Sequence, residues 1–203
     1  AVKPKGEITE VYNVIYNIDT LGNRLTPYEN LIQIDTNRAI LFVGGSITFG
    51  EGLNDDETLS YFIQESSARS ALNTGMHGYG AHQALRILED EELYRKRTKG
   101  NSIKSIIYRF IPAHIKRTAG YSPWDNSGPC YEISQSGDIE YRGSFEECSK
   151  RNDPILSRLA LSNGEPFTAS LFKRLTFKGN YFKSFEYLKL EDIDRFLAVT
   201  RRM

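Results

Sequence analysis

The sequence lacks the features that define several large protein classes. It has only two cysteines and three histidines in 203 residues, and its 26 basic side chains balance its 26 acidic ones. No apolar run approaches the roughly 18 residues that a membrane-spanning helix needs. A basic nucleic-acid surface is not indicated, and the glycine turns match no nucleotide-binding pattern. We predict a globular protein with no nucleic-acid partner and no membrane span.

Scarce cysteines and histidines also limit the chemistry. Cys130 and Cys148 flank a segment that is predicted to form a hairpin. A disulfide between them would indicate a periplasmic or secreted protein, and two unpaired thiols are the open alternative. His77, His82 and His114 are too scattered to form a ligand cluster. We expect no metal site.

Apolar runs and turn residues predict the order of elements in the first half of the chain. Residues 39–43 form a buried strand that ends at a glycine pair. Apolar residues at helical spacing follow and predict a helix. After this helix we expect a short strand at 71–73, another helix, and a third strand at 102–111. Strands that alternate with helices favour a doubly wound parallel sheet. The fold class is therefore α/β, a three-layer α/β/α (flavodoxin-like) arrangement.

Burial can be predicted for the same elements. Leu59, Phe62 and Ile63 share one helical face and should point inward. In the next helix Ala84, Leu85 and Leu88 should also point inward. The nearly continuous apolar run at residues 102–111 suits a strand that is buried on both faces.

The remaining segments flank this sheet. Residues 1–38 read as a small β-rich N-terminal extension, and residues 39–203 as the α/β domain. A hairpin insertion is expected at about 120–150, with strands at 131–134 and 139–142. Residues 153–203 read as helical, with breaks at 163–166 and 178–180. Three parallel strands make a thin sheet, so we expect it to be incomplete at the C-terminus.

Two glycine turns follow successive strands and should open on the same edge of the sheet. The first presents the hydroxyl of Ser46, and the second contains Gly78. Ligands bind at the carboxyl ends of strands in open α/β sheets. Backbone amides from both turns could face one atom, as a tetrahedral oxyanion requires. A helix-capping serine and a simple turn glycine are the alternatives.

In these two turns the sequence resembles the SGNH hydrolases, also called GDSL esterases or lipases. The first family block is similar to Gly44-Gly45-Ser46-Ile47-Thr48-Phe49-Gly50-Glu51-Gly52, and the second to Asn73-Thr74-Gly75-Met76-His77-Gly78-Tyr79-Gly80. The resemblance covers about residues 39–115, and the N-terminal lead-in looks like the prefix of some bacterial members. It implies that Ser46 is the nucleophile and that the amides of Ser46 and Gly78 are oxyanion donors. It also implies that the reaction uses no metal or organic cofactor.

The sequence departs from the family pattern at three places. Gly45 replaces the aspartate that braces the nucleophile turn. Ala113 stands where an asparagine donor is expected, and the neighbouring His114 is a weak candidate to replace it. The Asp-x-x-His block that supplies the base is absent from the sequence. A fragment of a longer protein is one explanation, and a natural loss of catalysis is the other.

The resemblance therefore predicts a serine ester hydrolase or acyl transferase that forms an acyl-enzyme on Ser46. Its substrate would be a small-molecule or glycan acyl ester. Because a serine without an adjacent base is a weak nucleophile, we expect little or no turnover from this chain. The alternative is a non-catalytic binding module of the same fold. The sequence predicts neither the oligomeric state nor the acyl group.

Overall fold

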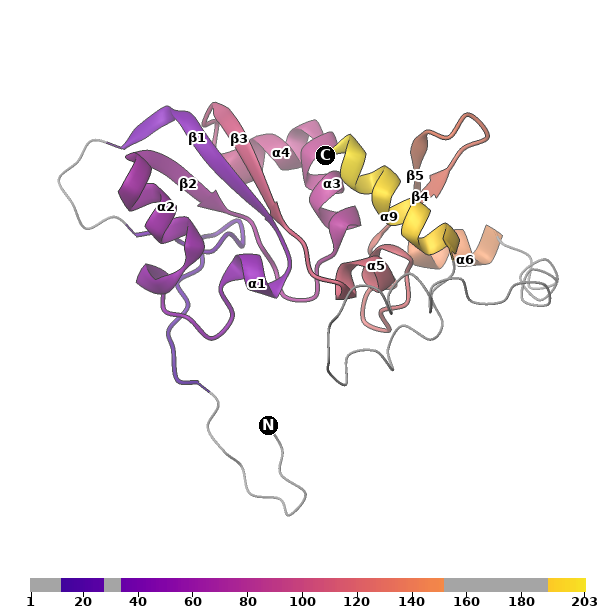
Figure 1. Ribbon diagram of the computed structural model, residues 1–203, viewed down its shortest axis with the longest axis horizontal. Coiled ribbons are helices and arrows are strands. Elements are labelled where there is room, and N and C mark those ends of the chain that lie inside the picture. Colours follow the sequence, from indigo (N-terminus) through magenta and orange to yellow (C-terminus); the bar gives the residue numbers. More distant parts are fainter. Residues whose placement is uncertain (1–11, 28–33, 152–189) are drawn as a thin grey trace, which may run out of the picture. The chain divides into compact units, whose positions relative to one another are not determined.

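A computed structural model describes residues 12–27, 34–151 and 190–203 of the protein (Figure 1). The chain divides into two units, which are 1–79 with 87–110, and 80–86 with 111–203. This division differs from the expected boundary after residue 38. The described part of the N-terminal extension, residues 12–27, joins the first unit, since Arg24 forms an isolated bridge to Asn73. Residues 12–27 contain isolated bridges rather than strands.

A three-stranded parallel sheet forms the centre of the first unit. β1 (Asp35–Gly44) lies between β2 (Arg69–Asn73) and β3 (Ile103–Arg109), in the order β2-β1-β3. Ile40, Phe42 and Ala71 are buried together, and Ile63 and Ile107 pack against them. The prediction of a mixed α/β fold with a parallel sheet is confirmed.

Short helical segments connect these strands. After β1 the chain forms α1 (Ser46–Phe49), the 3-10 turn η1 (Asp55–Glu57) and α2 (Leu59–Ser67). After β2 come α3 (Ala81–Glu89) and α4 (Glu91–Thr98). Ala84 and Leu85 are buried as predicted, and Leu88 is half-buried. The expected single helix is two helices because the Asp90 side chain accepts a hydrogen bond from Leu93 N (3.0 Å) and caps α4.

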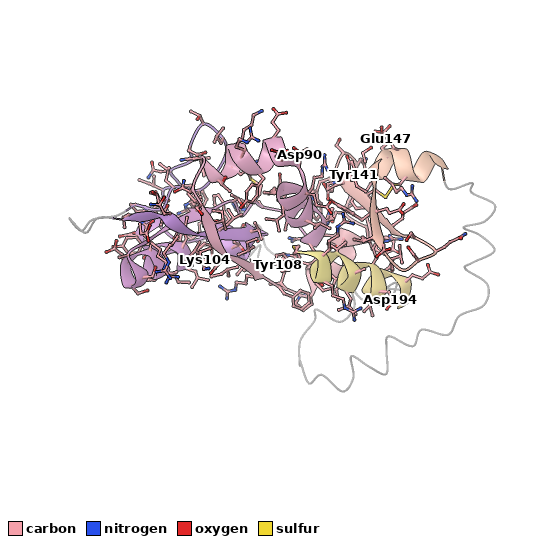
Figure 2. The ribbon with its side chains drawn as sticks, turned by 90° about the horizontal axis from the view of Figure 1, so that it is seen from above. Asp90, Lys104, Tyr108, Tyr141, Glu147 and Asp194 are labelled. Carbon is pink, nitrogen blue, oxygen red and sulfur yellow. A yellow bond between two sulfur atoms is a disulfide. The ribbon has the colours of Figure 1, made fainter. Side chains whose placement is uncertain are left out.

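The prediction that the third strand is buried on both faces is wrong. Lys104, Ser105 and Ile106 of β3 are exposed, and Ile106 retains 41 % of its accessible surface. Among the described strands, β3 lies at one side of the sheet and pairs with β1 alone. Figure 2 shows Lys104 and Tyr108 on this strand. A continuous apolar run does not distinguish a central strand from an outer one.

The predicted inner face of α2 is also wrong in part. Leu59 and Phe62 are exposed, at 38 % and 59 %, and only Ile63 packs into the core. The buried positions are the polar residues Ser60 and Gln64. Gln64 Oε1 accepts a hydrogen bond from Ala71 N (3.0 Å), and its Nε2 donates to Pro27 O (2.9 Å). Gln64 thus satisfies a backbone group of the outer strand β2, which would otherwise offer a pairing edge.

The second unit contains the predicted hairpin. β4 (Pro129–Ile133) and β5 (Ile139–Ser144) pair antiparallel. α5 (Ala113–Thr118) precedes the hairpin, and α6 (Phe145–Arg151) follows it.

The C-terminal helix α9 (Leu190–Arg202) contacts α5, β4 and β5. It buries Phe196 and Val199, whereas Leu197 is exposed. The predicted breaks at 163–166 and 178–180 lie outside the described residues.

A disulfide joins Cys130 of β4 to Cys148 of α6, with Cα atoms 6.6 Å apart. Its bond appears in yellow beside α6, which carries Glu147 (Figure 2). The disulfide resolves the open choice between paired and free thiols, and it is compatible with an extracytoplasmic location. It also removes both thiolates from the group of Cys130, Glu132 and Cys148 that could otherwise approach a metal. Within the described ranges, no helix is both long and apolar enough to cross a membrane.

We predict that the disulfide stabilises the second unit. The two cysteines are 18 residues apart, and a crosslink over such a loop contributes about 3 kcal/mol by limiting the unfolded chain. Replacing both cysteines by serine should lower the unfolding free energy by this amount in urea titrations. A thiol count of zero in the native protein checks that the bond is present. Equal midpoints with and without reductant would contradict the prediction.

Candidate functional site

Ser46 occupies the first position of α1, directly after the carboxyl end of β1. Gly45 is the N-cap of this helix, and Ser46 is half-buried. Among the described residues, its hydroxyl has no hydrogen-bond partner. Its backbone N–H belongs to the first helical turn, where amides lack partners within the helix. Both groups are therefore available to a ligand.

The second glycine turn packs directly against the first. Met76 N donates to Gly44 O at 3.0 Å, and Thr74 N donates to Phe42 O at 2.9 Å. A side chain at Gly75 would place its Cβ 2.5 Å from Phe49 N. Only glycine allows this approach, so Gly75 lets the second turn lie against α1.

Gly78 lies in the second turn and adopts a φ of +82°, a conformation that L side chains rarely adopt. Tyr79 N donates to Met76 O (3.2 Å), which closes a tight turn around Gly78. Gly78 is half-buried. Ser46 and Gly78 thus belong to the same unit, on two turns that are hydrogen-bonded to each other.

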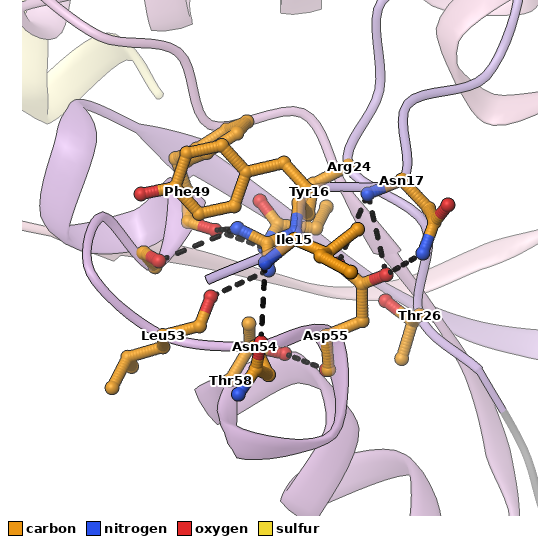
Figure 3. A network of polar contacts seen from close by, with 12 residues as sticks. Ile15, Tyr16, Asn17, Arg24, Thr26, Phe49, Leu53, Asn54, Asp55 and Thr58 are labelled. Carbon is orange, nitrogen blue, oxygen red and sulfur yellow. Dashed lines mark hydrogen bonds and ion pairs between the residues drawn. The ribbon is translucent and has the colours of Figure 1, made fainter. Parts of the chain in front are cut away.

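A buried arginine holds the loop that follows α1. Arg24 is only 1 % exposed, and its Nε lies 2.6 Å from Asp55 Oδ1. The guanidinium also donates to three backbone carbonyls, those of Phe49 (3.5 Å), Gly50 (3.3 Å) and Leu53 (2.8 Å). Figure 3 shows these contacts converging on Arg24.

Two neighbouring side chains complete the surroundings of this guanidinium. Its central carbon lies 4.4 Å from the centre of the Tyr16 ring and 4.8 Å from that of Phe49, within the range of cation–π contacts. The Asp55 carboxylate also accepts hydrogen bonds from the side chain and backbone of Asn17. The buried charge is therefore paired and hydrogen-bonded, as buried charges need to be.

Asn73, the last residue of β2, holds the same turn from the neighbouring strand. Its Nδ2 donates to Thr48 O (2.9 Å), and its Oδ1 accepts from Gly75 N (3.0 Å). The side chain therefore links the end of α1 to the second glycine turn. Asn73 and Arg24 thus supply hydrogen bonds to the segment that follows Gly45.

The weak candidate His114 lies in the second unit. It is 1 % exposed, and burial, together with the charges of Arg117 and His82, lowers its pKa to about 3. An imidazole with so low a pKa is a weak base at neutral pH. It stands in α5, directly after Ala113.

His82 is also buried in the second unit, near the start of α3. Its Nε2 lies 2.8 Å from Asp125 Oδ2, and the ring packs on Phe145. Burial lowers the pKa of His82, although the Asp125 carboxylate opposes this shift. These contacts fit the structural role that its place in the helix suggests.

His77 is the third histidine, and it lies in the first unit. Its Nδ1 is 3.6 Å from Glu51 Oε2, and both side chains are exposed, at 42 % and 41 %. Its ring centre lies 4.4 Å from that of Phe49. No sequence pattern pairs residues 51 and 77, because their proximity depends on the contact between the two glycine turns. The contacts of Arg24 could not be predicted from the sequence for the same reason.

A cavity of about 530 Å³ lies in the first unit but away from Ser46. Its lining includes Asp19, Thr36, Ser70, Lys99 and Asn101, whereas Ser46 and Gly78 do not line it. The candidate site is therefore the open surface formed by the two glycine turns.

Comparison with known proteins does not assign a family. A scan of protein-family models found no match to this sequence, and a search of curated proteins found none either.

We predict that removing the charge of Arg24 strongly destabilises the first unit. Arg24→Met leaves the Asp55 carboxylate and three carbonyls without their donor, and breaking a buried ion pair costs roughly 3–5 kcal/mol. Urea unfolding checks this value. The matched control is Arg95→Met, which removes an exposed ion pair with Glu91 and should cost less than about 1 kcal/mol. Similar losses in both variants would contradict the prediction.

We predict that the second unit loses stability in mild acid. The folded pKa of His114 is about 3, below its ordinary value of 6.5, so between these values only the unfolded chain takes up the proton. Stability should therefore fall as the pH falls through this window, by at most about 1.4 kcal/mol per pH unit for one histidine. Urea unfolding at several pH values measures the slope.

His114→Gln should reduce this slope, since the new side chain does not titrate. The control is His77→Gln, which changes an exposed histidine of the first unit instead of a buried one of the second. An identical slope in wild type and His114→Gln would contradict the assignment to His114.

Proposed function

We propose that this chain is a serine ester hydrolase or acyl transferase of the SGNH type, with Ser46 as the nucleophile. The observation that carries the proposal is the contact between the two glycine turns. The Met76–Gly44 hydrogen bond and the close packing of Gly75 on α1 bring the second turn to the end of β1. That end of a strand is where open α/β sheets bind ligands.

The finer fold assignment belongs to the same proposal. We assign the first unit to the three-layer, flavodoxin-like class, because the order β2-β1-β3 matches the start of the doubly wound order 2-1-3-4-5. In that topology the ligand site lies at the switch point beside β1, the strand that leads into Ser46.

In the proposed reaction, Ser46 Oγ attacks the carbonyl carbon of an acyl ester and its proton passes to a base. The carbonyl oxygen becomes an oxyanion, which accepts hydrogen bonds from the amides of Ser46 and Gly78. Each such donor contributes roughly 3 kcal/mol to catalysis. Collapse of the intermediate expels the alcohol, and water or a second alcohol then releases the acyl group.

The substrate in this proposal is a small-molecule or glycan acyl ester. The Cys130–Cys148 disulfide supports an extracytoplasmic setting, where the acyl groups of surface glycans are accessible. The reaction requires no cofactor, since serine, amide donors and a base supply its chemistry.

The second candidate function is a binding module that recognises acyl esters without cleaving them. The sequence favours this candidate in one respect, because it contains no Asp-x-x-His motif. An enzyme and a binding module would share the two glycine turns but differ in the reactivity of Ser46.

A fluorophosphonate probe distinguishes the two functions. We expect intact-mass spectrometry to show one adduct on the 203-residue chain, and peptide mapping to place it on Ser46. Ser46→Ala should remove the adduct. Gly78→Ala should slow labelling by about 10²–10³-fold, because the strained turn would displace the donor amide. Absence of labelling under conditions that label a serine esterase would contradict a reactive Ser46 in these 203 residues and favour the binding module.

A further inference from the structure

The cavity of the first unit lies along β2 and reaches the amino ends of the neighbouring strands. Its lining includes Ser70 and Leu72 of β2, Thr36 near the start of β1, and Asn101 just before β3. Ser46 follows the carboxyl end of β1, where α1 begins (Figure 1). The cavity volume of about 530 Å³ falls within the range of about 300–1,000 Å³ that is usual for small-molecule pockets. The cavity is therefore a candidate binding site that Ser46 does not line.

The charged side chains that line the cavity are already paired within the protein. Lys99 Nζ lies 2.8 Å from Asp19 Oδ2, and the Arg24 guanidinium pairs with Asp55. Although burial opposes the shift, hydrogen bonds from Lys99 and from two backbone amides lower the pKa of Asp19, so its carboxylate is charged at neutral pH. A charged ligand would find no free counter-charge in the described lining, and burying an unpaired charge is costly. The lining therefore favours a neutral ligand.

Asn101 gives the cavity a buried hydrogen-bond acceptor. Its Nδ2 donates to Thr98 O at 2.7 Å, and its backbone N donates to the same carbonyl at 2.9 Å. These bonds hold the carboxamide in place, and its Oδ1 atom is buried without a hydrogen-bond partner among the described residues. Buried acceptors are normally satisfied, because leaving one unpaired destabilises the protein. The Oδ1 atom therefore indicates a ligand that donates a hydrogen bond.

The rest of the lining combines hydroxyl groups with apolar side chains. Thr36 and Ser70 each contribute a hydroxyl, and within the described ranges neither hydroxyl has a hydrogen-bond partner. A hydroxyl can both donate and accept. Leu25, Ile34 and Leu72 contribute apolar surface to the same cavity. A sugar ring matches both kinds of surface, because it carries hydroxyls at its edge and C–H groups on its faces.

We propose that this cavity binds a neutral sugar. Asn101 Oδ1 accepts a hydrogen bond from one hydroxyl of the sugar, and the hydroxyls of Ser70 and Thr36 bond to others. The C–H groups of the ring pack on Leu72. Binding of this kind does not depend on the reactivity of Ser46, so its failure and the failure of the proposed function are distinguishable.

An NMR titration that resolves the backbone amides of the 203-residue chain tests the proposal. The probes are D-glucose, D-galactose and D-mannose, each beside its uronate and its 2-amino sugar, which keep the ring and add one charge. We expect at least one hexose to shift the amide signals of Ser70, Leu72 and Asn101 saturably, with a Kd of about 1 mM or lower. The Ser46 amide should not shift. The charged counterparts should bind at least about tenfold more weakly, because their charge would be unpaired.

Two variants and a matched control locate the site. Asn101→Leu keeps the approximate size of the side chain but removes the buried acceptor, and it should weaken binding about tenfold or more. Ser70→Ala removes one hydroxyl and should weaken binding severalfold. The control Asn126→Leu makes the same change at an exposed position of the second unit, and it should leave the affinity unchanged. The dispersion of the amide signals checks that each variant folds.

Every result of this titration bears on the proposal. If no hexose shifts these signals at up to about 10 mM, ten times the weakest expected Kd, the cavity does not bind a sugar. Equal affinity in wild type, Asn101→Leu and Ser70→Ala would place the sugar elsewhere and overturn the assignment. Tighter binding of a charged counterpart would contradict the neutral class. Shifts confined to the turns of Ser46 and Gly78 would exclude this site while supporting a glycan substrate for the proposed function.

Discussion

The buried charge of Arg24 is the constraint on which the first unit depends. A guanidinium has five N–H donors and cannot lose its proton in a protein, so burying it requires acceptors on every side. Asp55 supplies the counter-charge, and the carbonyls of Phe49, Gly50 and Leu53 supply the remaining acceptors. Because these carbonyls belong to the end of α1 and the loop after it, the charge can be satisfied only when both are in place.

The N-terminal segment therefore takes part in the candidate site although it precedes the sheet. Arg24 reaches the loop because its own backbone is bound to β2, where Arg24 N donates to Asn73 O at 3.0 Å. The Asn73 side chain in turn holds Thr48 O and Gly75 N. Residues from before β1, after β1 and after β2 are thus linked by hydrogen bonds around the turn of Ser46. Gly45 contributes no side chain to this network.

Local sequence patterns predicted the elements well and their burial less well. The strand that leads to Ser46, the hairpin and the C-terminal helix could be read from apolar spacing and turn residues, which reflect interactions between near neighbours. The exposure of Phe62 and of Ile106 could not be predicted from these patterns, because it depends on which strands lie at the edges of the sheet. Gln64 is buried for a similar reason, since its partners Ala71 and Pro27 are distant in sequence from one another.

The sequence by itself determined that a serine follows a buried strand on a glycine turn, and that a second glycine turn follows the next strand. Strand ends and tight turns are local, so their residues identify them. Only the tertiary structure decided that the two turns bond to each other, that Arg24 is buried against the end of α1 and that His77 meets Glu51. These contacts join residues 26 to 32 positions apart, and such pairs form only when the parallel strands set the turns side by side.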